Sequence, residues 1–198
     1  MTVVAQEDTR TRILAVALEL IAEHGYAGTS TRQVCERMGF TKAALFYHFP
    51  AKSALLEALA APVLRDLEAL GATPVSAGTA ARGRVVARYV HLVVTHADVM
   101  RVLYDDPSTR NQDALKALRP LYERLFRLLC GTESPSAAEL ARARAVAGAV
   151  HAALLRAAPE HEPGILLSAA LSAGCGALGV PLPRAQQPAT TPSHGGSS

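Results

Sequence analysis

Apolar residues recur at helical spacing along most of the 198-residue chain. Within residues 10–24 they lie three or four positions apart, as on one face of a helix. A second stripe runs through 51–70, and residues 82–96 are apolar nearly all round, which indicates a central buried helix. Further helices are predicted at 98–105, about 113–130, 137–157 and 164–178. No segment alternates convincingly in the manner of a strand, so we expect an all-α protein.

Two shorter helical segments joined by a tight turn lie between the first two of these stripes. Ser30 and Gln33 match the S-x-x-Q capping box, which predicts the start of one helix. Gly39 can adopt a positive φ and end that helix. Thr41 can cap the next helix, which Pro50 would end. Two helices joined so closely form a helix-turn-helix, whose second helix fits the major groove of DNA.

Positive charge is concentrated in this segment. The whole chain carries a formal net charge of only +3. Within residues 30–52, however, four Lys and Arg residues stand against the single acid Glu36, a balance that suits contact with phosphates. A solvated helix face would give the same composition, but the helix-turn-helix pattern favours DNA as the partner.

The order of these motifs resembles the tetracycline-repressor-like (TetR) family of bacterial regulators. The similarity covers residues 10–56 and includes the stretches Met38-Gly-Phe-Thr-Lys42 and Leu45-Phe-Tyr-His-Phe-Pro-Ala-Lys-Ser-Ala-Leu-Leu56. It implies an all-helical homodimer of about nine helices, with a helix-turn-helix DNA-binding domain, expected at 1–52, and a ligand-binding and dimerisation domain, expected at 53–180. Residues 181–198, rich in Pro, Gln, Ser, Thr and Gly, are interpreted as a disordered tail.

The resemblance also implies which residues contact a double-stranded DNA operator. The groove-facing candidates are Thr41, Lys42, Ala43 and Tyr47. A lysine can donate hydrogen bonds to guanine, and an alanine methyl can touch a thymine methyl. The expected phosphate contacts are Ser30, Thr31, Arg32, His48 and Lys52. Ala44 and Phe46 stand where the family commonly has hydroxyl-bearing residues, so one phosphate contact per subunit is not expected here.

An unidentified small-molecule effector is the second partner that the resemblance implies. Its pocket is expected among the helices that begin near Leu55, Arg82, Asp98 and Asp113. The polar or adaptable residues available to orient a ligand there are Tyr89, His91, His96, Met100, Tyr104, Tyr122 and Cys130. A single histidine or tyrosine of this kind is more often a core or rim residue than a ligand contact. Few aromatic residues and many Val, Leu and Ala favour an apolar or compact ligand.

The last two predicted helices carry apolar stripes suited to a dimer interface. The stripe residues are Val146, Val150, Leu154, Leu167, Leu171, Gly174 and Leu178. Two such helices from each subunit would form a four-helix interface with two-fold symmetry, which predicts a palindromic operator. One face of each helix is also expected to serve the monomer core.

The motifs of other protein classes are missing from the chain. The G-x-G-x-x-G match at Gly174–Gly179 ends a helix instead of following a strand, so it does not predict nucleotide binding. The three cysteines form no C-x-x-C pair, and we expect no metal, no cofactor and no enzymatic activity. The N-terminal residues form no apolar run, and nothing approaches about 18 apolar residues. A cytoplasmic protein without a signal peptide or membrane span is therefore expected.

Together these features predict a ligand-responsive transcriptional regulator, most simply a repressor that binds a palindromic operator as a dimer. Ligand binding is expected to pivot the long helix that begins at Ala51, change the separation of the two recognition helices and release the DNA. The alternatives are a helical small-molecule-binding module or an enzyme without specific DNA binding.

Overall fold

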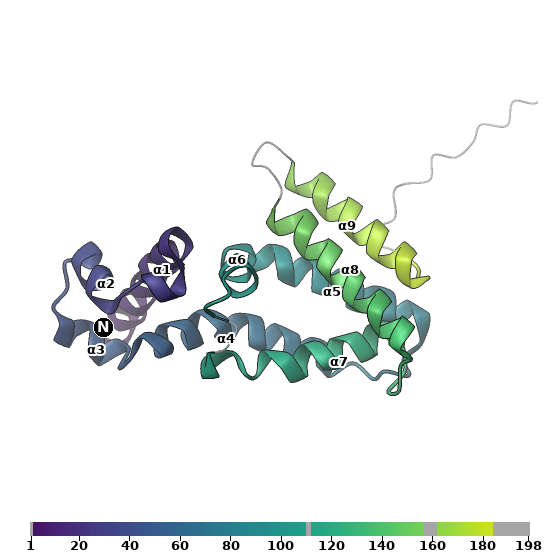
Figure 1. The fold of residues 1–198 in the computed structure, drawn as a ribbon, viewed down its shortest axis with the longest axis horizontal. Coiled ribbons are helices and arrows are strands. Elements are labelled where there is room, and N and C mark those ends of the chain that lie inside the picture. The colour runs from purple at the N-terminus through teal and green to yellow at the C-terminus, as the bar shows by residue number, and fades with distance from the viewer. Residues whose placement is uncertain (1, 110–111, 157–161, 184–198) are drawn as a thin grey trace, which may run out of the picture.

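The computed structural model describes residues 2–109, 112–156 and 162–183, and within these ranges it contains only helices and loops (Figure 1). A short 3-10 helix, η1 (Asp113–Leu115), precedes α7. The α-helices are α1 (Thr2–Gly28), α2 (Thr31–Met38), α3 (Lys42–His48), α4 (Lys52–Gly71), α5 (Gly78–Thr95), α6 (Ala97–Asp105), α7 (Leu118–Cys130), α8 (Ala137–Leu155) and α9 (Pro163–Leu178). The expected all-α fold is confirmed.

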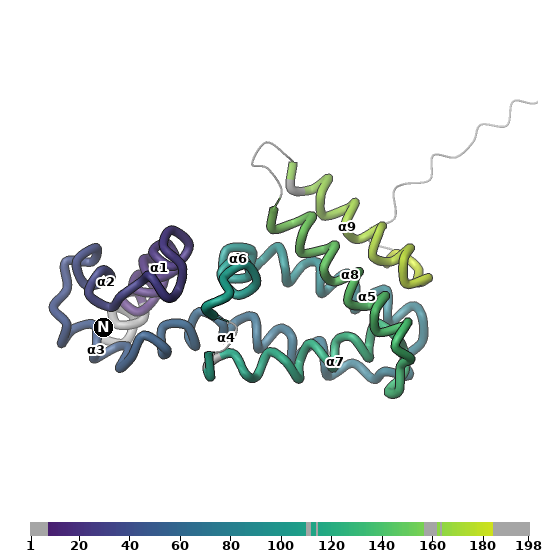
Figure 2. The backbone as a smooth tube through the Cα atoms, viewed as in Figure 1, coloured from purple at the N-terminus to yellow at the C-terminus, as the bar shows by residue number. Residues whose placement is uncertain are grey.

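Helix α4 connects two groups of helices that lie at opposite ends of the molecule (Figure 1). Helices α1, α2 and α3 form the smaller group around the start of α4. Helices α5 to α9 form the larger group, in which α8 and α9 run side by side along one edge (Figure 2). The helix-turn-helix is therefore held away from the larger group, with α4 as the continuous connection between them.

Three hydrophobic clusters hold this arrangement together. The N-terminal cluster comprises Ile13, Ala17, Leu20, Val34, Cys35, Leu45, Phe49 and Leu55. The linking cluster, between α1, α4, α6 and η1, comprises Ile21, Tyr26, Leu56, Leu59, Ala60, Val102 and Leu115. The C-terminal core surrounds α5, whose Val85, Val86, Tyr89, Val90, Leu92 and Val93 are all buried, as the sequence predicted. Helix α4 contributes buried residues to all three clusters.

Several helix boundaries differ from the predicted ones. Helix α1 begins at Thr2 and continues past a kink at Gly25, where φ is 73°. Helix α5 begins at Gly78, four residues before the predicted start. The predicted helix at 113–130 is divided into η1 and α7, because Pro120 lacks a backbone N–H and is accommodated only in the first turn of α7. Helix α8 ends at Leu155.

The residues that follow α9 pack against the C-terminal core. Val180 is buried, and Leu182 packs against the core. The carbonyl oxygen of Pro181 approaches Gly83 of α5 so closely that a Cβ at position 83 would lie 2.2 Å from it. Residues 181–183 therefore lie against the larger group, and residues 184–198 of the expected tail lie outside the described residues. Among the described helices, none has the length and apolar character needed to cross a membrane.

Candidate nucleic-acid interface and ligand cavities

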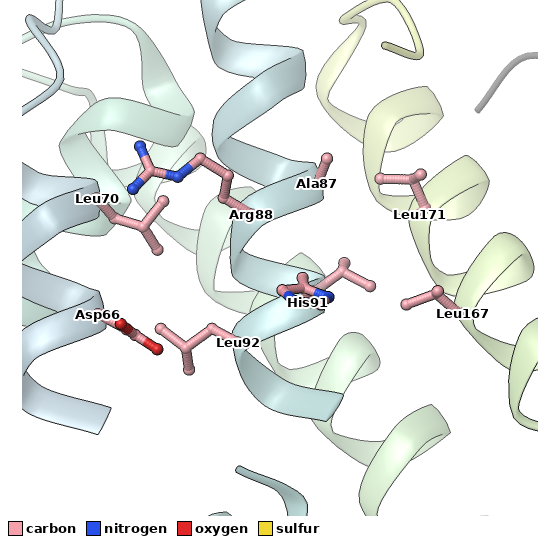
Figure 3. Close-up of a pocket in the computed structure, with 9 residues that line it drawn as sticks. Asp66, Leu70, Ala87, Arg88, His91, Leu92, Leu167 and Leu171 are labelled. Carbon is pink, nitrogen blue, oxygen red and sulfur yellow. The ribbon is translucent and has the colours of Figure 1, made fainter. Parts of the chain in front are cut away.

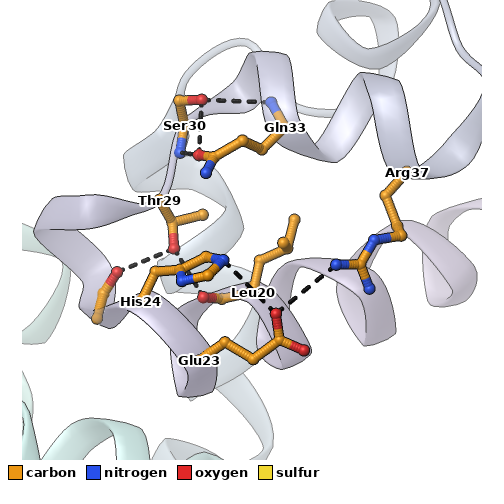
Figure 4. Close-up of polar contacts among 8 residues, drawn as sticks. Leu20, Glu23, His24, Thr29, Ser30, Gln33 and Arg37 are labelled. Atoms are coloured by element: carbon orange, nitrogen blue, oxygen red, sulfur yellow. Dashed lines mark hydrogen bonds and ion pairs between the residues drawn. The ribbon is translucent and has the colours of Figure 1, made fainter.

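Helix α2, the first helix of the motif, starts and ends where the sequence predicted. The Ser30 hydroxyl accepts a hydrogen bond from the Gln33 backbone N–H, and Gln33 Oε1 accepts one from the Ser30 N–H at 2.7 Å, which completes the capping box (Figure 4). Gly39 ends the helix in the left-handed conformation with φ of 67°. The local sequence therefore fixes both ends of α2.

A buried threonine and an ion pair hold α2 against α1 (Figure 4). The hydroxyl of Thr29, a residue only 4% exposed, donates to the carbonyl oxygens of Leu20 and Gly25 at 3.0 and 2.9 Å. Arg37 Nη2 lies 3.6 Å from Glu23 Oε2. These contacts orient α2 relative to the end of α1, on which the position of α3 in turn depends.

Helix α3 buries one side in the N-terminal cluster. The Thr41 hydroxyl accepts a hydrogen bond from the Ala44 backbone N–H at 3.2 Å, so Thr41 is the predicted cap. Leu45 and Phe49, one turn apart, are buried. Arg10 packs over the Phe49 ring at 4.2 Å and donates to a backbone carbonyl at the end of α3, so it stabilises this helix end.

The opposite side of α3 is exposed and carries the predicted groove-facing residues, Thr41, Lys42, Ala43 and Tyr47. Tyr47 is 75% exposed, the largest exposed fraction of any large hydrophobic residue described. The Lys42 ammonium lies 5.3 Å from the centre of the half-buried Phe46 ring. Phe46 therefore supports the lysine side chain on the exposed surface, and Ala44 beside it is also exposed.

The predicted phosphate contacts are divided between two places. At the start of α2, Ser30 is exposed, Thr31 is half-buried, and Arg32 extends into solvent while paired with Glu36 at 2.7 Å. Beyond α3, His48 is half-buried and its ring lies edge-on to Tyr47. Of these side chains, those of Ser30 and Arg32 are exposed and those of Thr31 and His48 are half-buried; Lys52 is described next.

Lys52, the first residue of α4, lies where the two groups of helices meet. Its ammonium is 4.1 Å from the centre of the Tyr26 ring. Burial lowers the pKa of Lys52, although the nearby Asp106 carboxylate opposes that effect. The lysine predicted to bind phosphate thus also packs within the connection between α1 and α6.

The kink in α1 creates a polar contact with the end of α6. Beyond Gly25, the backbone N–H groups of Tyr26 and Ala27 donate to Asp106 and Ser108, the latter at 3.1 Å. Burial alone would raise the pKa of Asp106, but the hydrogen bonds from Tyr26 and Ser108 lower it overall. We call this set of contacts the Asp106 latch. No local sequence pattern predicts the latch, because Tyr26 and Asp106 are 80 positions apart.

Three of the predicted ligand residues converge on a histidine that the sequence analysis missed. His151, on α8, is 2% exposed, and its Nε2 lies 2.7 Å from the Tyr89 hydroxyl. Its ring lies edge-on to Tyr104 at 4.3 Å between centroids and to Tyr122 at 6.4 Å. A histidine among the apolar positions of α8 was the signal available in the sequence, but the sequence analysis considered that helix only for dimerisation and core packing.

The other predicted ligand residues are dispersed. His91 lines a cavity of about 500 Å³ along α5, between Asp66 and Leu70 of α4 on one side and Leu167 and Leu171 of α9 on the other (Figure 3).

Three more of them lie apart from this cavity and from His151. His96 pairs with Asp66 at 2.8 Å, Met100 is buried in the C-terminal core, and Cys130 lines a separate small cavity. The seven residues therefore do not form a single site.

Helices α8 and α9 present a shallow apolar groove on their outer side. It has a volume of about 490 Å³ and is lined mainly by alanine and glycine, with two valines and Arg142. Of the predicted interface residues, Val146, Val150 and Gly174 line this groove, although both valines are themselves buried and Val150 belongs to the C-terminal core. Leu154, Leu167, Leu171 and Leu178 belong to or pack against that core without lining the groove. The other small residues that line the groove are Ala145, Ala149, Ala153, Ala169, Ala170, Ala173 and Ala177.

These features define a helix-turn-helix protein with an attached helical domain. Comparison with known proteins agrees. Residues 13–59 match the family model described as bacterial regulatory proteins, tetR family. The class C tetracycline repressor of Escherichia coli is 44% identical over 55 residues, which cover 28% of this chain and 25% of that repressor. The chain thus matches only about a quarter of this curated relative, in the helix-turn-helix region.

Solved structures extend the similarity of fold to the larger group of helices. A TetR-family regulator from Streptomyces coelicolor A3, SCO3833, has a TM-score of 0.66 and 22% identity, and the alignment covers 84% of this chain and 88% of that one. The SmeT–triclosan complex has a TM-score of 0.61 and 22% identity, with 93% and 99% covered. Residues 13–59 therefore form the helix-turn-helix region of a TetR-family regulator, and the whole chain is similar in fold to solved members of that family. The prediction of a TetR-like helix-turn-helix DNA-binding region is thereby confirmed.

Proposed function

We propose that this chain is a ligand-responsive repressor that binds a palindromic operator as a homodimer. The observation that carries the proposal is the exposed side of α3, where Lys42, Ala43 and Tyr47 lie together on a helix whose other side is buried. A helix supported in this way fits the major groove, with its first residues against base edges. Repression is favoured because the curated relative is named as a repressor.

Contacts to the DNA backbone are proposed at the start of α2. Its free N–H groups and positive dipole favour a phosphate, and the side chain of Arg32 extends beside them. Arg32 is paired with Glu36 on the surface, an interaction of small net energy that a phosphate can replace. His48 and Tyr47 lie at the other end of the motif. Phosphates of one DNA strand can therefore be bound on one side of α3, and phosphates of the other strand on its other side.

The groove on α8 and α9 supports dimerisation. Alanine and glycine side chains allow helices to approach closely, and this outer surface is apolar although α8 and α9 already bury their inner sides in the core. A second copy packed across it would form a four-helix interface with two-fold symmetry. That symmetry would place two α3 helices about one DNA turn apart, roughly 34–36 Å.

A small molecule is proposed to weaken DNA binding through the end of α6. The cavity beside His151 is lined by Tyr104 and Asp105, and the next residue, Asp106, forms the latch with α1. A ligand that displaces Tyr104 or Asp105 would therefore also shift Asp106. Its contacts with α1 and with Lys52 at the start of α4 would change together. The structural neighbour SmeT has been solved with triclosan, which supports a small organic molecule as the class of effector.

The proposal is tested by selecting bound sequences from a random duplex library with the wild type and with the double variant Lys42→Ala/Tyr47→Ala. Recovery of a palindrome by the wild type alone is expected. The matched control is Arg119→Ala, which also removes one exposed positive charge but on α7, in the larger group of helices. Its selected sequences should equal those of the wild type.

Two outcomes would reject parts of this function. If neither wild type nor control enriches a motif at low salt, the chain does not read DNA sequence and is better described as a helical ligand-binding module. If the wild type enriches a single half-site without a palindrome, the DNA contacts stand and the two-fold arrangement is wrong.

A further inference from the structure

The buried histidine of α8 has one ring nitrogen without a partner. His151 Nε2 lies 2.7 Å from the Tyr89 hydroxyl, whereas Nδ1 is fully buried and has no hydrogen-bond partner among the described residues. Buried polar atoms are nearly always paired, because an unpaired one has lost its contact with water without replacement. This nitrogen therefore points to a partner that the protein itself does not supply.

The protonation of this cluster determines what kind of partner is needed. Burial lowers the pKa of His151 to about 4, so the ring is neutral at physiological pH and carries one N–H. Burial also raises the pKa of the Tyr89 phenol, which stays protonated. A phenol O–H donates to a bare imidazole nitrogen more favourably than an imidazole N–H donates to a phenol oxygen. The Tyr89 hydroxyl also contacts Tyr122, and we assign its hydrogen to the bond with His151, so that Nε2 is the acceptor and Nδ1 carries the hydrogen and requires an acceptor.

A small cavity between α6 and α8 lies against the same histidine. It has a volume of about 140 Å³ and is lined by Tyr104, Asp105, Gly148, His151, Ala152 and Leu155, with Arg156 at its edge. A Cβ built on Gly148 meets no atom within 4 Å, so the space above this part of α8 is open. A cavity of about 150 Å³ accommodates one benzene ring. The space therefore suits a single ring.

The edges of the cavity set the orientation of such a ring. Tyr104, 45% exposed, lies edge-on to His151 and can stack on an aromatic ligand. Asp105 and Arg156 form an ion pair of 2.8 Å at the opening, which leaves this edge close to neutral. A ring that enters beside Tyr104 would direct its polar substituent toward His151, and a small shift of the surrounding side chains would open the buried Nδ1 to it.

We propose that His151, Tyr104 and Gly148 form an effector site for a compact, single-ring molecule bearing a carbonyl or carboxylate oxygen that accepts a hydrogen bond from His151 Nδ1. That a ligand bound here acts as an effector rests on the proposed function. The binding site itself is independent of DNA, because none of its residues lies on α2 or α3.

Direct titration of the full chain tests the site with three probes of similar size. Acetophenone carries a neutral acceptor, benzoate a charged one, and ethylbenzene none. Acetophenone or benzoate is expected to bind about three- to tenfold more tightly than ethylbenzene, the range of one hydrogen bond, even though ethylbenzene is the more apolar probe. Tighter binding of acetophenone indicates a neutral carbonyl ligand, and tighter binding of benzoate indicates an anion held near Arg156.

Three variants locate the binding. His151→Phe should abolish the preference for a probe with a hydrogen-bond acceptor. Gly148→Leu should weaken the binding of all three probes, because it fills the cavity while the histidine is retained. His91→Phe makes the same change in the larger cavity along α5 and should bind the probes as the wild type does. Thermal unfolding of each variant establishes that it is folded, and the imidazole ¹⁵N shifts of His151 should report a hydrogen on Nδ1 that responds to the probe.

Failure of this inference is distinct from failure of the proposed function. Equal affinities for the three probes, a bare Nδ1, or loss of binding in His91→Phe alone would overturn the site, whatever the result with DNA. If acetophenone or benzoate binds through His151 but leaves the affinity for the selected operator unchanged, the site stands and release by this ligand is rejected.

Discussion

The carboxylate of Asp106 accepts a hydrogen bond from the backbone N–H of Tyr26, and this contact joins the end of α6 to the kink in α1. Ser108 and Lys52 reinforce it, Ser108 by hydrogen bonds to Asp106 and Lys52 by its charge and its position over the Tyr26 ring. The end of the helix that borders the His151 cavity is therefore held directly to the DNA-binding end of the molecule.

Replacing Asp106 with Ala should lower the free energy of unfolding by about 1 to 3 kcal/mol, because two backbone N–H groups lose a charged acceptor. Denaturant unfolding followed by circular dichroism measures this change. Asp113→Ala is the matched control, since that carboxylate forms only an exposed ion pair with Lys116 and should cost little. Equal losses in the two variants would show that the latch contributes nothing specific.

His151 should make the stability of the protein dependent on pH. Burial lowers its folded pKa from 6.5 to about 4, although the charge of Asp105 opposes the shift. The unfolded chain therefore binds a proton between these values that the folded chain does not. Stability should be complete above about pH 6.5 and fall as the pH decreases towards 4, by up to about 3 kcal/mol. His151→Phe should lack this component, and identical pH profiles for the two proteins would contradict the assignment.

The capping box of α2 should have a measurable structural role. Ser30→Ala is expected to destabilise the protein by about 0.5 to 2 kcal/mol, because the Gln33 N–H loses its acceptor. Hydrogen exchange at the start of α2 localises the effect. Thr132→Ala removes an exposed hydroxyl that accepts a hydrogen bond in the loop before α8 and serves as the control. Exchange in α2 that is unaffected by Ser30→Ala would refute this role.

The groove on α8 and α9 should not tolerate a charge if it is the dimer interface. Ala149→Glu places a carboxylate on this exposed apolar surface and is expected to produce a monomer by sedimentation velocity, with operator affinity reduced on the order of 100-fold. Ala138→Glu lies on the first turn of α8, outside the groove, and should remain dimeric. A dimeric Ala149→Glu protein would place the interface elsewhere.

Lys42 is expected to contact either a phosphate or a base, and salt dependence separates the two. If it binds phosphate, Lys42→Ala should reduce the slope of log affinity against log salt by about one per subunit and weaken all duplexes alike. If it reads guanine, the variant should lose discrimination at one operator position by about 1 to 3 kcal/mol. No change in slope or in discrimination would remove Lys42 from the interface.

Local signals in the sequence predicted the helix-turn-helix well, and distant contacts escaped it. Ser30, Gly39 and Thr41 act through hydrogen bonds and backbone angles within a few residues, so their roles were visible in the chain itself. The Asp106 latch joins positions that no local pattern relates. His151 was overlooked for a similar reason, because only the packing of α8 against α5 brings it to Tyr89.

Helix α4 supplies Leu55 to the N-terminal cluster, Leu56, Leu59 and Ala60 to the linking cluster, and Val63 to the C-terminal core. A chimaeric regulator can be built by exchanging the DNA-binding helices between relatives. A junction at residue 52 would be unfavourable, because it would separate Leu55 from the residues of the N-terminal cluster that it packs against. A junction after Ala60 would transfer the complete N-terminal cluster together with the α4 side of the linking cluster. The recipient would then have to provide compatible partners at α6, η1 and the start of α7, together with Asp106 and Ser108 of the latch.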